Sequence, residues 1–196
     1  MLLEEIRAYR VILASASPRR KELLRSLGIS FEHAPAFTTD ESYSADLPAE
    51  EVPVYLARKK SLAYPGKLEE KDILITADTI VAQGNDILHK PTSKQHAFDI
   101  LKQLSESVHT VFTGVSLRSS SKSAEFISAT EVTFGSITDE EIDYYIETYR
   151  PYDKAGAYGI QEWIGFVAVE RISGSYFNVM GLPIHKLYRE LEYFIT

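Results

Sequence analysis

The sequence predicts an α/β fold in which a mixed β-sheet is flanked by helices. Short apolar runs suited to buried strands alternate along the chain with stretches whose apolar residues follow helical spacing. Two long β-rich segments near the middle of the chain are joined by a short serine-rich turn, as in a hairpin. The 196 residues are 44% hydrophobic and 25% charged, which is typical of a globular chain with a full core. Because helices and strands intermix, a mixed sheet is expected, in a single domain over residues 1–196.

Composition excludes several classes of protein. The chain has no cysteine, which rules out disulfides, thiolate zinc sites and cysteine nucleophiles. No apolar run is long enough for a transmembrane helix, and acids stand where a signal peptide carries cations, so we expect a cytoplasmic protein without a membrane partner. The net charge of −7 argues against nucleic acid as a partner, whereas a nucleotide needs only a local basic cluster.

The first element is a strand, loop and helix over residues 11–28. Residues 11–14 form the apolar strand, Ser17 is placed to cap the helix, Pro18 fits its first position and Gly28 ends it. The first helical turn carries two arginines, where the helix dipole favours acids, and this pattern indicates a bound anion. The alternative is an ordinary strand-loop-helix unit with solvated arginines.

The next elements follow from turn residues and periodicity. The predicted order is a short strand at 29–33, an acidic loop at 36–47, a helix from the low fifties to about residue 64, a strand at 73–83, and a hairpin partner at 87–89.

The second half of the chain is predicted in the same way. Ser93 caps a helix, Thr138 and Glu141 have capping-box spacing, and residues 152–161 form a glycine-containing loop. The other predicted elements are strands at 108–117, 126–134 and 166–172, a loop-strand-loop at 174–183, and a final helix at 183–194.

Asp78 is the sharpest single signal for chemistry. It lies within an apolar strand, where an unpaired carboxylate would be costly to bury. Such an acid lies at the exposed end of the strand, or it is engaged with a metal, a cation or hydrogen bonds. The alternative is a structural carboxylate held by a nearby backbone group or arginine, and the sequence leaves these interpretations open at this point.

The remaining polar candidates gain meaning as a set. Four of them are cations that could neutralise a polyphosphate: Arg19, Arg20, Lys60 and Lys90. Asp78, with Asp40 or Glu41 from the acidic loop, could hold a hard divalent ion such as Mg²⁺. Taken singly, these side chains would be solvated surface groups. The set suits phosphoryl or nucleotidyl chemistry in which a metal-activated water attacks, since no nucleophilic triad is present.

Several segments together resemble the Maf family of nucleoside triphosphate pyrophosphatases. They follow the family's order over nearly the whole chain: residues 13–24 (LASASPRRKELL), 77–79 (ADT), 90–91 (KP), 153–161 (DKAGAYGIQ), 174–176 (GSY) and 179–183 (VMGLP). The GAYGIQ form resembles the subgroup that acts on dTTP and UTP.

The resemblance implies a fold and an activity. Members have an elongated two-lobed, twisted mixed sheet flanked by helices, similar to ITPases, with substrate in a central cleft. They hydrolyse the α–β phosphoanhydride of a nucleoside triphosphate with Mg²⁺ or Mn²⁺, and they are generally cytoplasmic and often homodimeric. The expected substrates are dTTP, UTP and modified pyrimidine triphosphates.

The resemblance also implies roles for individual residues. Asp78 matches the general base or metal ligand of the family, and five cationic or hydroxyl positions match its phosphate-binding residues: Ser15, Arg19, Arg20, Lys60 and Lys90. Gln161 matches a position near the substrate. The family commonly has a glutamate pair where this chain has Thr39, Asp40 and Glu41, so either Asp40 or Glu41 is the loop acid.

A different class of function is a nucleotide-binding regulator of septum formation or cell shape that binds triphosphate without turnover. Pyrophosphate release in the presence of Mg²⁺ distinguishes this regulator from the enzyme. A third hypothesis, a nucleic-acid-binding protein, is disfavoured by the acidic net charge.

Overall fold

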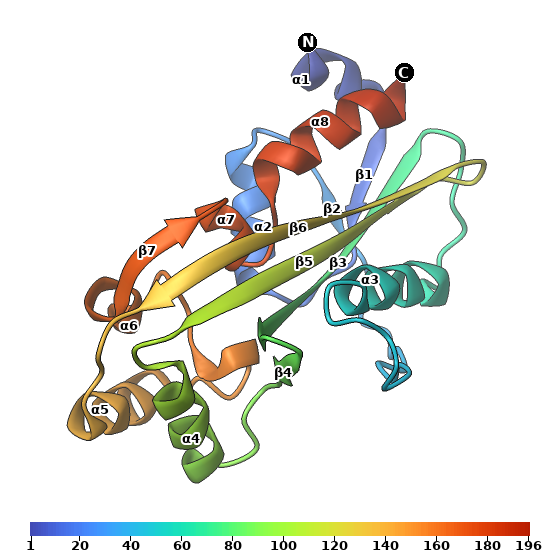
Figure 1. The fold of residues 1–196 in the computed structure, drawn as a ribbon. Coiled ribbons are helices and arrows are strands. Elements are labelled where there is room, and N and C mark those ends of the chain that lie inside the picture. Colours follow the sequence, from blue (N-terminus) through green and yellow to red (C-terminus); the bar gives the residue numbers. More distant parts are fainter. The chain divides into compact units, whose positions relative to one another are not determined.

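The computed structural model describes residues 1–196 and has a seven-stranded mixed sheet (Figure 1). Its strands are β1 (Arg10–Leu13), β2 (Glu32–His33), β3 (Asp72–Gln83), β4 (Asp86–Leu88), β5 (Val108–Arg118), β6 (Ser123–Phe134) and β7 (Val169–Ser173). The order is β2-β1-β3-β5-β6-β7, and β4 pairs with β3. Strand β1 is parallel to β2 and β3, whereas the β3–β4 and β6–β7 pairs are antiparallel. The predicted α/β class with a mixed sheet is confirmed.

The helices begin and end at sequence signals over most of the chain. They are α1 (Leu2–Glu5), η1 (Ile6–Ala8), α2 (Pro18–Ser26), α3 (Val52–Ala63), α4 (Lys94–Leu104), α5 (Asp139–Tyr149), η2 (Ala155–Ala157), α6 (Trp163–Val167), α7 (Tyr176–Val179) and α8 (Ile184–Ile195). Ser17, Ser93 and Thr138 cap their helices as predicted, and Thr138 forms the full capping box with Glu141. None of these helices combines the length and the apolar character needed to cross a membrane.

The chain divides into two compact units. The first unit comprises Met1–Asp78, Thr113–Ser128 and Gly181–Thr196, and the second comprises Thr79–Phe112 and Ala129–Met180. Strands β3, β5 and β6 each contribute residues to both units.

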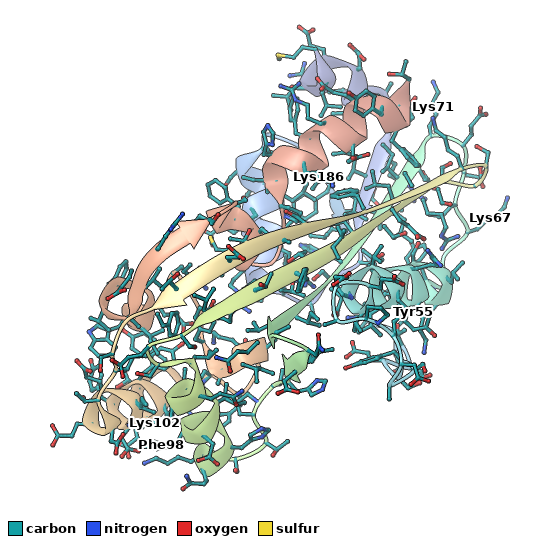
Figure 2. The ribbon with its side chains drawn as sticks, viewed as in Figure 1. Tyr55, Lys67, Lys71, Phe98, Lys102 and Lys186 are labelled. Carbon is teal, nitrogen blue, oxygen red and sulfur yellow. The ribbon has the colours of Figure 1, made fainter.

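The core of the first unit forms around the parallel β1–β3 pair, where Ile12 is in register with Leu74 and both side chains are buried. The two ends of the chain lie side by side in this unit (Figure 1), and the Tyr9 hydroxyl donates to the carbonyl of Ile195 over 3.1 Å. Lys186 of α8 (Figure 2) donates to the Ile127 carbonyl over 2.8 Å and thereby ties α8 to β6.

The core of the second unit is formed largely by the apolar faces of α4 and α5. The two helices lie next to each other (Figure 1). Leu101 of α4 and Ile142 of α5 are fully buried and belong to one core cluster. Figure 2 shows Phe98 and Lys102 on α4: Phe98 packs against the core, and Lys102 Nζ lies 2.6 Å from Asp139 Oδ1 on α5.

Two predictions near the C-terminus are wrong in part. Residues 163–167, of which 166 and 167 were expected to begin a strand, form helix α6, and strand β7 begins only at Val169. The predicted strand within 174–183 is replaced by helix α7. Ser175 caps α7 by accepting from the Asn178 amide, and the Asn178 side chain donates to the Val111 carbonyl over 2.9 Å. Hydrogen bonds from side chains to the backbone therefore override strand propensity in this short segment.

Candidate functional site

The loop between β1 and α2 fixes Arg20 in a defined position. Its Nε donates to the Gly181 carbonyl over 2.7 Å, and its Nη1 donates to the Ala77 carbonyl over 2.9 Å. The Ser15 hydroxyl accepts from the Ser17 amide at 3.3 Å and lies 3.5 Å from Arg20 Nη1. Burial lowers the pKa of Arg20 below the ordinary value of a guanidinium. The sequence prediction of an ordered, cationic first turn is consistent with this geometry.

Arg19 and Arg20 concentrate positive charge at the start of α2. Arg19 is half-buried in the same turn, and its charge further lowers the pKa of Arg20. The free N–H groups and the dipole of α2 add to this field, so the turn favours an anion.

Lys60 of α3 joins the two candidate acids Glu41 and Asp78. Its Nζ lies 2.5 Å from Asp78 Oδ1 and 2.9 Å from Glu41 Oε1. The side chains of Lys60 and Asp78 are 18% and 14% exposed, so this contact is shielded from bulk water while still reachable. The fields of Asp78 and Glu41 also raise the pKa of Arg20, against the larger effect of burial. The acids, Lys60 and the cationic turn therefore form one electrostatic cluster within the first unit.

Asp40 has different partners from its neighbour Glu41. Its Oδ2 lies 2.9 Å from Lys59 Nζ, and its carboxylate accepts from both the amide and the hydroxyl of Ser42. The hydrogen bond from Lys59, followed by those from Ser42, holds the pKa of Asp40 well below its usual range. Asp40 therefore stabilises the acidic loop, whereas Glu41 reaches the group around Asp78.

Two carboxylates, those of Asp78 and Glu41, are available to hold a small divalent cation. They are fewer than a complete protein site, since no group of three or more His, Cys, Asp or Glu side chains is arranged to hold a metal. Magnesium is commonly bound through one or two carboxylates, with substrate phosphates and waters as the other ligands. Asp78 and Glu41 supply such a pair, because both approach the same ammonium group.

The other two predicted substrate-binding residues lie in the second unit. Lys90 follows β4 and is exposed. Gln161 lies between η2 and α6, and its Oε1 is buried without a hydrogen-bond partner. A buried acceptor that is left unpaired costs free energy, which a ligand that donates to it would recover.

The network of side chains around the Gln161 loop was not predicted from the sequence. Lys154 is 7% exposed and lies 3.2 Å from Glu162 Oε1. The Tyr145 hydroxyl donates to Glu162 and accepts from the Gly159 amide at 3.0 Å. This network holds the loop that carries Gln161. A buried tyrosine on the α5 stripe was the available signal, because its hydroxyl needs a partner.

Tyr43 of the acidic loop was also missed. Burial raises the pKa of its phenol, and the charge of Asp78 raises it further. Spacing in the sequence offers no signal for this effect, because it depends on the path of the loop.

Comparison with known proteins supplies close relatives over the full length. The chain is 50% identical over 191 residues to the dTTP/UTP pyrophosphatase of Phocaeicola vulgatus, covering 97% of this chain and 99% of the relative. It is 47% identical to the protein of the same name from Parabacteroides distasonis, covering 98% of this chain and 100% of that one.

A solved structure and a family model also match. The structure of a HAM1 protein from Coxiella burnetii aligns with a TM-score of 0.48 and 15% identity, over 94% of this chain and 99% of that one. The family model described as Maf-like protein matches residues 10–194. The chain therefore belongs to the Maf family.

Proposed function

We propose that this protein hydrolyses dTTP and UTP to the monophosphate and pyrophosphate. The observation that carries the proposal is the cluster of Asp78, Glu41 and Lys60 beside the cationic turn of Arg19 and Arg20. The proposal is supported by full-length relatives named dTTP/UTP pyrophosphatase at 47% and 50% identity.

The cationic groups bind the triphosphate chain. Arg19, Arg20 and Ser15 present donors to phosphate oxygens, and the guanidinium of Arg20 is preorganised by its two carbonyl contacts. As the bond between the α-phosphorus and the bridging oxygen breaks, negative charge grows on the departing pyrophosphate. Fixed cations stabilise that charge without reorganising.

Asp78 acts as the general base. A water attacks the α-phosphorus, and its proton passes to the Asp78 carboxylate while pyrophosphate leaves. Lys60 holds the Asp78 carboxylate in position before substrate binds, because its Nζ lies 2.5 Å from Asp78 Oδ1. A divalent cation, Mg²⁺ or Mn²⁺, held by Asp78 and Glu41 would neutralise phosphate charge and make the attacking water more acidic.

The substitution Asp78→Asn tests the proposal. It keeps the shape of the side chain and removes the base, so turnover of dTTP and UTP is expected to fall by about 10²-fold or more. Pyrophosphate release with Mg²⁺ over a panel of common and modified triphosphates is the measurement, with Asp46→Asn in the exposed loop as the matched control. Turnover that survives within a few-fold would remove Asp78 from this role. Tight binding without product in the unmodified protein would instead favour the regulator, which no contact in the structure favours.

Other features remain predictions from the sequence and the family resemblance. They are substrate binding by Lys90 and Gln161, a single domain with a central cleft, cytoplasmic location, a homodimer, and the absence of a nucleic-acid partner. Light scattering after size-exclusion chromatography would test the dimer, and Lys90→Ala and Gln161→Ala would test binding through the KM for dTTP.

A further inference from the structure

A cavity lies in the first unit, lined by α3, β5 and β6. Its volume is about 380 Å³, which is within the range of small-molecule sites. The lining residues are Arg58, Ser61, Leu62, Ser116, Arg118, Ser123, Ala124 and Glu125. None of them belongs to the cluster around Asp78, although Ser61 directly follows Lys60 in α3.

The cavity arises from small residues on one face of β5. Gly114, Ser116 and Arg118 alternate along the strand and share the face toward α3. At Gly114 the helix backbone is so close that an added Cβ would lie 2.2 Å from the Val54 nitrogen. Further along β5, Arg118 Nε donates to Ser61 Oγ over 2.9 Å, and its Nη2 donates to the Ser61 carbonyl. Between these two contacts Ser116 leaves the space open.

The charges that line the cavity do not balance. Arg58 is paired with Glu125, whose two carboxylate oxygens lie 2.7 and 2.8 Å from Arg58 Nε. Arg118 has no carboxylate partner, and its bonds to Ser61 use only part of its five-donor fork. One uncompensated guanidinium in a concave, partly desolvated site attracts an anion.

Ser116 adds a hydroxyl to the wall of the cavity. The residue is 2% exposed and lines the cavity. A serine hydroxyl carries one donor and two acceptor lone pairs, so it can bind a ligand oxygen that enters this space.

We infer that this cavity binds a phosphoryl group, either as free phosphate or on a small organic phosphate. The phosphoryl oxygens accept from the remaining donors of Arg118 and from the Ser116 hydroxyl. The cavity extends beyond a single phosphate, and Leu62 and Ala124 offer apolar contact for an organic substituent. The site is independent of the proposed hydrolysis, because it uses neither Asp78 nor the turn at Arg19.

The test is a titration of the full chain, without nucleotide or divalent metal, followed by backbone amide NMR. The probes are inorganic phosphate and phenyl phosphate, with sodium chloride at matched ionic strength as the control. Saturable shifts at Ser61, Ser116 and Arg118 are expected with phosphate or its ester and not with chloride. Tighter binding of phenyl phosphate identifies an organic phosphate, whereas equal or tighter binding of inorganic phosphate identifies the free ion; either result supports the site.

Two variants make the inference falsifiable. Ser116→Val fills the cavity with apolar volume, and Arg118→Gln removes the charge. Each should weaken binding by about tenfold or more, whereas Arg7→Gln, at an exposed arginine in η1, should leave it unchanged. If Arg118→Gln fails to fold, Ser116→Val decides the matter. No saturable shift at these amides, or shifts that persist unchanged in Ser116→Val, would overturn the inference without touching the proposed hydrolysis.

Discussion

Glu41 and Asp40 are neighbours in the loop and have unlike partners, which allows their roles to be separated. Glu41 lies 2.9 Å from Lys60 Nζ and shares that group with Asp78, whereas Asp40 is bound to Lys59 and Ser42. We expect Glu41→Gln to lower turnover by about tenfold or more and to raise the Mg²⁺ concentration needed for half-maximal rate. Asp40→Asn should change the rate by less than about threefold, because exposed ion pairs contribute little. Initial rates against Mg²⁺ concentration measure both. If Asp40→Asn lowered turnover more than Glu41→Gln, then Asp40 and not Glu41 would be the acid that acts with Asp78.

His109 is a buried residue whose ionisation opposes folding. It is 1% exposed, its Nε2 lies 2.8 Å from the Tyr158 hydroxyl, and its Nδ1 has no partner. Burial lowers the pKa of His109 from 6.5 to about 4. In the unfolded chain His109 therefore binds a proton below pH 6.5, whereas in the native state it does so only below about pH 4. The resulting stability is fully present above pH 6.5 and is lost as the pH falls through this window.

The expected loss in the free energy of unfolding from this residue is about 3 kcal/mol at most between those limits. Urea unfolding at a series of pH values measures it. His109→Phe should reduce the slope in this window, whereas His185→Gln, at an exposed histidine, should not. An equal slope in the protein and in His109→Phe would show that other groups carry the acid sensitivity.

Gly114 sets the spacing between α3 and β5. An added Cβ would meet helix backbone atoms of Pro53 and Val54 at 2.2 to 2.4 Å, and backbone cannot rotate away as a side chain can. We expect Gly114→Ala to destabilise the protein by about 1–3 kcal/mol, the usual cost of overpacking. Thermal unfolding is the measurement. Gly66→Ala is the matched control, since its Cβ would meet only the Tyr64 ring, which can move. Equal melting temperatures for the two variants would contradict the close approach.

Elements with local signals were predictable from the sequence, whereas elements held by distant contacts were not. The caps at Ser17, Ser93 and Thr138 and the strand at 73–83 depend on residues a few positions apart. Helix α7 depends on Asn178, whose side chain reaches the Val111 carbonyl, 67 residues away in sequence. β-propensity depends on the local residues, so it predicted a strand in this segment, where a long-range hydrogen bond stabilises a helix.

At the scale of the whole molecule, the candidate site is assembled from segments far apart in sequence. Arg20 is held by Gly181, at a separation of 161 residues, and Lys60 contacts Asp78 from a different element. The resemblance to family motifs predicted the candidate site residues, but it could not show that Asp40 and Glu41 contact different lysines. That distinction follows from the path of the acidic loop, which no periodicity encodes.

Lys60 gives Asp78 and Glu41 an internal counter-ion, and this has a consequence for chelation. Because the ammonium group already offsets the repulsion between the two carboxylates, folding of the first unit does not require a bound metal. EDTA should therefore abolish turnover of triphosphates while shifting the melting temperature by no more than about 1–2 °C. Calorimetry with and without the chelator is the measurement. A much larger drop in the melting temperature would mean that the fold requires the metal. An unchanged thermogram would show that the protein is fully folded before its substrate and the metal ion bind.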